Sequence, residues 1–250
     1  MNISTIPFLV IDRPNLLIPA QQINYQTQVG IMTHACTSNN FRKKIKSVNL
    51  IKICDSGVFL KASNRKHLTY SELFSRYEEM SVNYGIIFDV LGEANATIKE
   101  AEKAINTYSN RRRKWKLVGV AQGQNINEYA YCTRQLIKLG YQHIAIGGML
   151  KKNQSTARYV RVKNNNFLEN VLNEVRQNWS GWLFVLGCYH PKRVNLFEKY
   201  QLFGSDSKRW ALQCQAGLST KDRHSQLVRN FVSSYPSILK TSDSYTTAFL

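Results

Sequence analysis

The amino-acid sequence predicts an α/β protein built as a single, irregular (β/α)8 barrel of the TIM type. Two observations lead to this prediction: short apolar segments rich in β-branched residues recur along the 250 residues, and segments rich in helix-forming residues lie between them. Buried parallel strands are near-continuous apolar runs, because both of their faces are covered. Eight such strands alternating with helices in one domain are typical of this barrel. A doubly wound open sheet is the alternative.

The predicted strands follow one another at intervals that leave room for a helix. The clearest are the runs IIF, LVGVA, IAI and WLFVLG, which contain almost no polar residues. We expect the eight strands at Pro7 to Ile11, Val29 to His34, Leu50 to Cys54, Gly85 to Asp89, Leu117 to Ala121, His143 to Ile146, Trp182 to Gly187 and Gln201 to Gly204.

The most evident helices lie between the later strands. Residues Ala94 to Tyr108 carry apolar side chains at three- and four-residue steps, which places them on one helical face. Residues Asn127 to Leu139 precede Gly140, and glycine commonly follows the last turn of a helix. Phe167 to Asn178 are the third predicted helix. We expect residues 1–250 to form one domain, with residues 233–250 as a peripheral C-terminal tail.

Charge is the strongest feature of the composition. The chain has 34 Lys and Arg against 16 Asp and Glu, a formal net charge of +18. Such an excess is typical of proteins that bind a polyanion, because neutralised phosphates release their counterions. Apolar residues make up 43% and charged residues 20% of the chain, which excludes a disordered or low-complexity protein. Nucleic acid is therefore the expected partner.

The spacing of the cysteines and the lengths of the apolar runs predict neither a metal site nor a membrane-spanning segment. The five cysteines form no C-x-x-C pair, so neither a zinc site nor a disulfide framework is predicted, and we expect no metal and no cofactor. The longest apolar run, Gly181 to Tyr189, is too short to cross a bilayer, and no secretory signal is evident. The expected location is the cytoplasm, that of a bacterium or, for a virus-encoded chain, of its host cell.

Polar residues and glycines follow the predicted strands where each strand ends. An aspartate at such a position is more often a helix N-cap than a catalytic group, so each placement alone is weak. Because the carboxyl ends of barrel strands meet at one rim, where such barrels place their chemistry, the set is more informative than its members. The set consists of Asp55 with Ser56, Asp89, Gln122, Gly147 with Gly148, His190 and Asp206.

These segments carry a resemblance to a known family. CDSGVF, IIFDVLGEA, GVAQG, HIAIGG, CYHP and GSDSKRW occur in the order and spacing of the tRNA-guanine transglycosylases, over about Lys52 to Trp210. The chain looks most like the branch that places 7-deazaguanine bases into DNA. The resemblance implies an irregular (β/α)8 barrel, in agreement with the strand count. It also implies a base-exchange glycosyltransferase that replaces guanine by a 7-deazaguanine co-substrate such as preQ0.

Carried over position by position, the resemblance implies two catalytic carboxylates. Asp206 matches the nucleophile that attacks the anomeric carbon to give a covalent glycosyl-aspartate. Asp55 matches the general acid and base that moves a proton to the departing base and from the entering one. Two displacements of this kind retain the configuration at the anomeric carbon, as in retaining glycosidases.

The same comparison implies a set of base-binding residues. Asp89 and Gln122 match positions that recognise guanine, since a carboxylate accepts from N1–H and the 2-amino group while an amide donates to O6. Gly147 and Gly148 would let the backbone approach a flat heterocycle, or would simply form a strand-to-helix turn. The remaining two base-binding candidates have structural alternatives: Ser56 as a helix cap and His190 as a structural imidazole.

The chain departs from the queuine-type tRNA enzymes in ways that favour DNA. It has no C-x-C-x-x-C zinc motif with a downstream histidine, so we expect the barrel to lack the family zinc subdomain. Three alternatives remain open: the same chemistry on tRNA, a non-catalytic nucleic-acid-binding subunit, and an unrelated barrel hydrolase. Accessory DNA-modification proteins and a homodimer are further open points.

Basic residues near the predicted catalytic rim are the expected contacts to nucleic acid. Because a stacked nucleotide hides its glycosidic carbon, the target guanosine must be flipped out or unpaired. The basic run from Arg111 to Lys116 precedes a strand and should lie at the opposite rim, as a solvated loop or a partner contact. The expected phosphate contacts are Lys151, Lys152, Arg158, Arg161, Lys163, Lys192, Arg193, Lys208 and Arg209.

Overall fold

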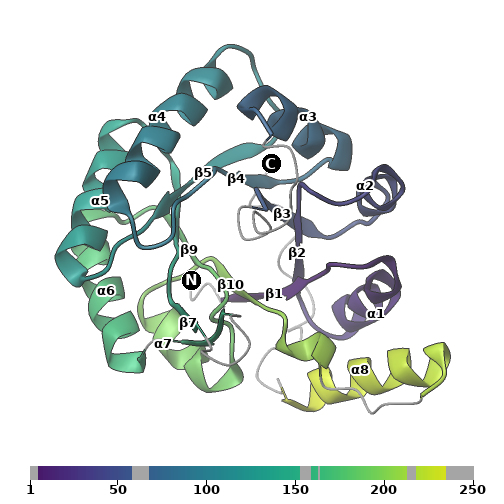
Figure 1. Ribbon diagram of the computed structural model, residues 1–250. Coiled ribbons are helices and arrows are strands. Elements are labelled where there is room, and N and C mark those ends of the chain that lie inside the picture. Colours follow the sequence, from purple (N-terminus) through teal and green to yellow (C-terminus); the bar gives the residue numbers. More distant parts are fainter. Residues whose placement is uncertain (1–4, 58–67, 153–158, 163, 213–217, 235–250) are drawn as a thin grey trace.

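Eight parallel strands close into a barrel, which confirms the predicted fold class. The computed structural model describes residues 5–57, 68–152, 159–162, 164–212 and 218–234. In Figure 1 the strands form a central ring and the helices lie around it. Around the barrel the order is β1-β10-β9-β6-β5-β4-β3-β2. The barrel strands are β1 (Ile6–Val10), β2 (Gly30–His34), β3 (Ile51–Asp55), β4 (Tyr84–Ile86), β5 (Lys116–Ala121), β6 (His143–Ile146), β9 (Trp182–Val185) and β10 (Gly204–Ser207).

The helices pack their apolar faces on the outside of the barrel, and four of the α-helices begin at polar side-chain caps. The side chains of Ser38, Thr69, Asn125 and Asn164 each accept a backbone N–H in the first turn of the helix that follows. Gly140 has φ +89° just after the predicted helix Asn127 to Leu139, as its position there suggested. The helices are η1 (Pro14–Leu16), α1 (Leu17–Gln26), α2 (Asn39–Lys46), α3 (Tyr70–Met80), α4 (Ala94–Ser109), α5 (Ile126–Lys138), α6 (Asn165–Asn178), η3 (Pro191–Arg193), α7 (Val194–Lys199), η4 (Arg209–Leu212) and α8 (Thr220–Ser234).

Aromatic side chains fill the end of the barrel where its strands begin. Trp182 stacks on Tyr84 and on Phe184, with ring centroids 4.8 and 5.9 Å apart, and it also contacts His143 and Phe203. A barrel plugged in this way is a packed core and not a pore. Any chemistry inside the barrel is therefore confined to the opposite end, which we call the mouth, where the strands have their carboxyl ends.

Strand register decides which side chains face the barrel interior. A Cβ on Gly30 or on Gly204 would overlap the ring of Phe8, so these three residues share the interior face. Side chains alternate along a strand, and paired residues on neighbouring strands share a face. Asp206 lies two residues after Gly204 and is paired with Phe8, so it faces inward. Asp55 faces inward too, because its partner His34 lies four residues after Gly30.

Two strands differ from their predicted bounds by three residues, and the others by smaller amounts. We predicted the last strand at Gln201 to Gly204, but β10 begins at Gly204, so Asp206 lies within the strand and not after it. The sequence GSDS has no apolar pattern, and it is held as a strand by its parallel pairing with β1 and β9. The fourth strand, β4, ends at Ile86, before the predicted Asp89.

Further differences lie after β6 and at the C-terminal end. An antiparallel hairpin of β7 (Leu150–Lys152) and β8 (Tyr159–Val162) follows β6, and polar residues in both strands hid it from the apolar pattern. Helix α8 runs to Ser234, so the first two residues of the predicted tail are helical, and the rest of that tail lies outside the described residues. Within the part of the chain that the structure describes, no helix has the length and apolar character needed to cross a membrane.

Candidate active site

Asp206 lies in the mouth of the barrel and is only 6% exposed. Its Oδ1 accepts a hydrogen bond of 2.7 Å from the backbone N–H of Gly187, and its carbonyl oxygen accepts one of 2.9 Å from Tyr189. The neighbouring Ser205 donates from its hydroxyl to the carbonyl of Val185 at 2.6 Å. These contacts tie β10 to the end of β9 and fix the orientation of the Asp206 carboxyl group.

Asp55 is the last residue of β3 and is half-buried. Its carbonyl oxygen accepts a hydrogen bond of 2.8 Å from the backbone N–H of Ala35, which holds the end of β3 to the segment after β2. The buried Ser56 hydroxyl lies 3.5 Å from Asp55 Oδ1 and donates to it. The structure thus places Ser56 against the Asp55 carboxylate, where it orients that group.

The pKa values of both carboxyl groups are raised, and the charge of Asp55 contributes to the shift of Asp206. The pKa of Asp206 is raised to about 7, chiefly by burial and in addition by the negative charge of Asp55, against the hydrogen bond from Gly187. Burial also raises the pKa of Asp55 to about 6, opposed by hydrogen bonds from Gly57 and Ser56. Carboxyl groups with pKa values near neutral can both hold and release a proton under physiological conditions, which is what general acid–base catalysis needs. Strongly shifted carboxyl groups at a barrel mouth are typical of functional sites.

Asp89 and Gln122 lie beside each other and are almost fully buried. The Gln122 Nε2 donates to Asp89 Oδ2, and the Gln122 Oε1 accepts a hydrogen bond of 3.2 Å from Gly92 N–H. Buried polar groups need such partners, because an unsatisfied donor or acceptor costs about 1–3 kcal/mol. In this structure each of the two predicted base-recognition side chains is therefore engaged by the other.

Gly147 and Gly148 pack against the same amide group. A Cβ on either residue would overlap the Gln122 side chain, and Gly148 also has φ +70°. The Tyr129 hydroxyl donates to the carbonyl of Gly147 at 2.8 Å, which fixes this turn from the helix side. The glycine pair therefore has a structural explanation without a ligand: it makes room for the Gln122 side chain in the tight turn between β6 and β7, where the sequence suggested a strand-to-helix turn.

His190 caps the short helix η3. Its Nδ1 accepts a hydrogen bond of 3.2 Å from the backbone N–H of Lys192. Partial burial and the positive charges of Arg209, Arg193 and Lys192 lower the pKa of His190, which keeps the imidazole neutral. The side chain has a structural role, the alternative raised from the sequence, and it stands among cations.

The predicted phosphate contacts divide into several groups. Lys208 is paired with Asp12 at 2.5 Å, and Arg193 donates to the carbonyl of Cys188 and to Asn165 Oδ1, each at 3.0 Å. Lys192 and Arg209 are exposed. The remaining predicted contacts are Lys151, Lys152 and Arg161, whose backbone lies in the β7–β8 hairpin and whose side chains are not described, and Arg158 and Lys163, which lie outside the described residues.

The basic run before β5 lies at the other end of the barrel, where the sequence placed it. Arg111 and Arg113 both form ion pairs with Glu78 of α3. The Arg113 guanidinium also lies over the Phe74 ring, 4.9 Å from its centroid, and its side chain is 5% exposed. Arg113 is therefore part of the packing between α3 and β5, while Arg112 and Lys114 remain exposed.

Two further residues at the mouth were missed from the sequence. His34 ends β2 and is the register partner of Asp55. Asp12 follows β1 and holds Lys208, the residue directly after β10. The same test of strand-end residues, applied to the first two strands, would have found both.

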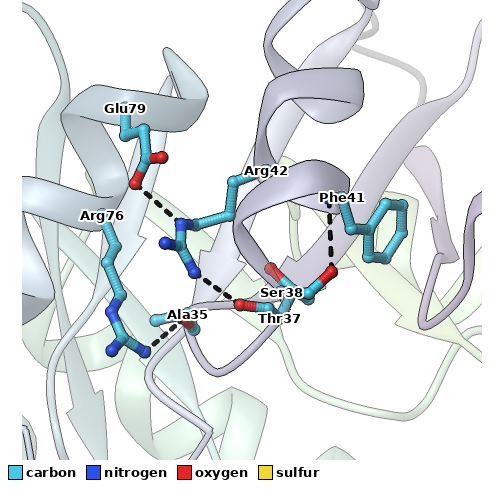
Figure 2. A network of polar contacts seen from close by, with 7 residues as sticks. All are labelled: Ala35, Thr37, Ser38, Phe41, Arg42, Arg76 and Glu79. Carbon is cyan, nitrogen blue, oxygen red and sulfur yellow. Dashed lines mark hydrogen bonds and ion pairs between the residues drawn. The ribbon is translucent and has the colours of Figure 1, made fainter.

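The segment after β2 is held in place by two arginines, as Figure 2 shows. Arg42 donates from Nε to Glu79 at 2.7 Å and from Nη1 to the carbonyl of Thr37. Arg76 donates to the carbonyl of Ala35 at 2.9 Å. The N–H of Ala35 in turn donates to the carbonyl oxygen of Asp55. Two side chains from α2 and α3 thereby fix the backbone that borders Asp55.

No protein-family model matches this chain, and no curated protein matches it.

Two hollows on the surface do not include the paired carboxylates. One, of about 410 Å³, lies between α1 and α8 and is lined by Tyr25 and Val228 among others. The second, of about 230 Å³, lies beside Gly92 and Gln124, next to the Asp89–Gln122 pair. Among the described residues, no three His, Cys, Asp or Glu side chains come together as metal ligands. The chemistry that these residues offer is that of paired carboxylates.

Proposed function

We propose that this protein is a base-exchange glycosyltransferase that replaces guanine in a nucleic acid, DNA in preference to tRNA, with a 7-deazaguanine base. The observation that carries the proposal is that Asp55 and Asp206 face the same barrel mouth, where the charge of Asp55 raises the pKa of Asp206. The motif resemblance and the net charge of +18 support it.

The proposed reaction consists of two displacements at the anomeric carbon of the target nucleotide. In the first, an oxygen of ionised Asp206 forms a bond to C1′ while the C1′–N9 bond breaks, and Asp55 donates its proton to the departing guanine. In the second, ionised Asp55 takes the N9 proton of the entering base, N9 bonds to C1′, and the Asp206 ester bond breaks. The Gly187 N–H bonded to Asp206 Oδ1 orients the nucleophile throughout.

Base recognition in this proposal uses the Asp89–Gln122 pair. In the free protein the two side chains bind each other. A purine offers the same partners: its N1–H and 2-amino group donate to a carboxylate, and its O6 accepts from an amide. Binding would thus exchange one set of buried hydrogen bonds for another, which avoids leaving an unsatisfied polar group in the free site.

The test compares Asp206→Asn with the wild-type protein on a guanine-containing oligodeoxynucleotide and an isotopically labelled 7-deazaguanine base. Nucleoside mass spectrometry measures exchange, and a denaturing gel measures covalent trapping. We expect the variant to lose both, because an amide cannot form the glycosyl ester. Asp222→Asn is the matched control, since Asp222 is an exposed carboxylate in the first turn of α8. Unchanged exchange by Asp206→Asn would refute the assignment.

Substrate choice is tested by competition. We expect labelled base to enter DNA rather than tRNA when both are present, because the zinc motif of the queuine-type tRNA enzymes is absent from the sequence. Incorporation into tRNA alone would support the base-exchange reaction but would make tRNA, and not DNA, the substrate. Nucleic-acid binding with no incorporation into either would indicate a non-catalytic subunit.

A further inference from the structure

The segment between β9 and η3 connects Asp206 to an exposed group of cations. Gly187 donates to the Asp206 side chain and Tyr189 donates to its carbonyl oxygen. His190 is the next residue, and Lys192 follows within η3. Whatever binds to the side chains of His190 or Lys192 therefore lies one or two residues from the backbone that orients Asp206.

The capping hydrogen bond determines which nitrogen of His190 can donate. Nδ1 accepts from the N–H of Lys192, so it carries a lone pair and the imidazole proton lies on Nε2. Three neighbouring cations disfavour a second proton on this ring. His190 thus presents one N–H donor, in a fixed tautomer, within a positively charged environment.

The cations around His190 have distinct roles. Arg193 is held to the Cys188 carbonyl and to Asn165, so it contributes charge from a fixed position. Lys192 and Arg209 are exposed, and among the described residues neither forms an ion pair with a carboxylate. Lys208 differs from them, because Asp12 already neutralises it.

We propose that His190, Lys192 and Arg209 bind one backbone phosphodiester of the nucleic-acid strand, beside the nucleotide presented to Asp206. A phosphodiester has two acceptor oxygens and one negative charge, which suit an N–H donor flanked by exposed cations. This assignment rests on the proposed function and replaces the expectation that His190 contacts the base. The phosphate would hold the strand against the same segment that orients the nucleophile.

The first experiment measures binding of a fluorescently labelled, abasic single-stranded oligodeoxynucleotide by anisotropy over a range of salt concentrations. We expect Lys192→Gln combined with Arg209→Gln to weaken binding roughly tenfold, since contacts to charged groups are the stronger ones. The salt slope should fall by about 0.7, the value for one phosphate of a single strand. The matched control is Arg112→Gln combined with Lys114→Gln, two exposed cations at the other end of the barrel. Equal losses in both double variants would overturn the proposal.

The second experiment separates the cap from the phosphate contact. His190→Asn keeps a side-chain acceptor for the Lys192 N–H but removes the Nε2–H donor. We expect an unchanged melting temperature and a several-fold loss of oligonucleotide binding. In the wild-type protein, ¹⁵N spectra of the imidazole should show an Nε2–H signal that shifts when the abasic strand binds. An imidazole signal that does not move at saturating strand would refute the contact.

The same experiments distinguish binding of a nucleic-acid strand from binding of inorganic phosphate, and they distinguish phosphate binding from base exchange. Inorganic phosphate should shift the imidazole signal only at far higher concentration than the strand, and an equal response to both would overturn the nucleic-acid assignment. The abasic strand carries no base to exchange, so these results do not depend on catalysis. Binding of the strand phosphate without base exchange would refute the proposed function but would support the phosphate site at His190.

Discussion

The carboxyl groups of Asp55 and Asp206 belong to strands separated by β1 and β2 in the barrel, yet the charge of Asp55 raises the pKa of Asp206. Both residues face inward at the carboxyl ends of their strands, and both are shifted upward chiefly by burial. Taking two acids out of water and placing them near each other costs folding free energy. Such an arrangement is typical of sites where stability is given up for chemistry.

The coupling between these two groups is directly measurable. Replacing Asp55 by Asn removes a negative charge, so Asp206 should ionise more easily and its pKa should fall from about 7. It should stay above the usual range for aspartate, because burial is the larger cause. Titration of the Asp206 carboxyl carbon by ¹³C NMR checks this, with Asp222→Asn as the control that leaves the pKa unchanged. An unaltered Asp206 titration in Asp55→Asn would show that the two groups do not interact.

Asp206→Asn should stabilise the fold, and more so as the pH rises. The folded-state pKa of about 7 lies above the usual 3.8, so the contribution of Asp206 to stability is fully present below pH 4 and is lost as the pH rises toward 7. Asparagine does not titrate, and it can still accept from Gly187. Between pH 4 and 8 the gain of the variant over the wild type should grow by an amount on the order of a few kcal/mol. Urea denaturation at several pH values measures it, and a gain that does not change with pH would contradict the assignment.

Gly148→Ala should lower the free energy of unfolding by more than the strain of a positive φ alone would. A Cβ at Gly148 would overlap Gln122 and the Tyr129 hydroxyl, in addition to the strain of φ +70°. We expect a loss of about 2–3 kcal/mol in the free energy of unfolding. Gly140→Ala is the control, because Gly140 has φ +89° but no atom within 4 Å of an added Cβ, so its loss should be about 1 kcal/mol. Equal losses from denaturant titrations would mean that the Gln122 packing is unimportant.

Arg42→Lys should loosen the segment that borders Asp55. Lysine keeps the charge opposite Glu79 but cannot also donate to the Thr37 carbonyl, so we expect a loss of about 1–2 kcal/mol. The amide of Ala35, which donates to Asp55, should then exchange with solvent faster. Hydrogen exchange followed by NMR checks this. Lys43→Ala, at an exposed position in the same helix, should change neither stability nor the Ala35 exchange rate.

Local patterns were sufficient to predict the architecture. Most strand positions agree with the apolar runs, and the caps and Gly140 agree with the helix limits, because burial and capping act over a few neighbouring residues. The polar strand β10 could not be found this way, since its pairing with β1 and β9 holds it. The hairpin of β7 and β8 escaped prediction for a similar reason.

The residues at the mouth show the same division. The sequence by itself determined that Asp55, Asp89, Gln122, His190 and Asp206 come near the carboxyl ends of barrel strands, because that depends only on their positions next to local apolar runs. Only the tertiary structure decided that Gln122 binds Asp89, that His190 caps η3 among cations, and that Asp12 neutralises Lys208. These relationships depend on register around a closed barrel and on burial, both of which join residues far apart in the chain.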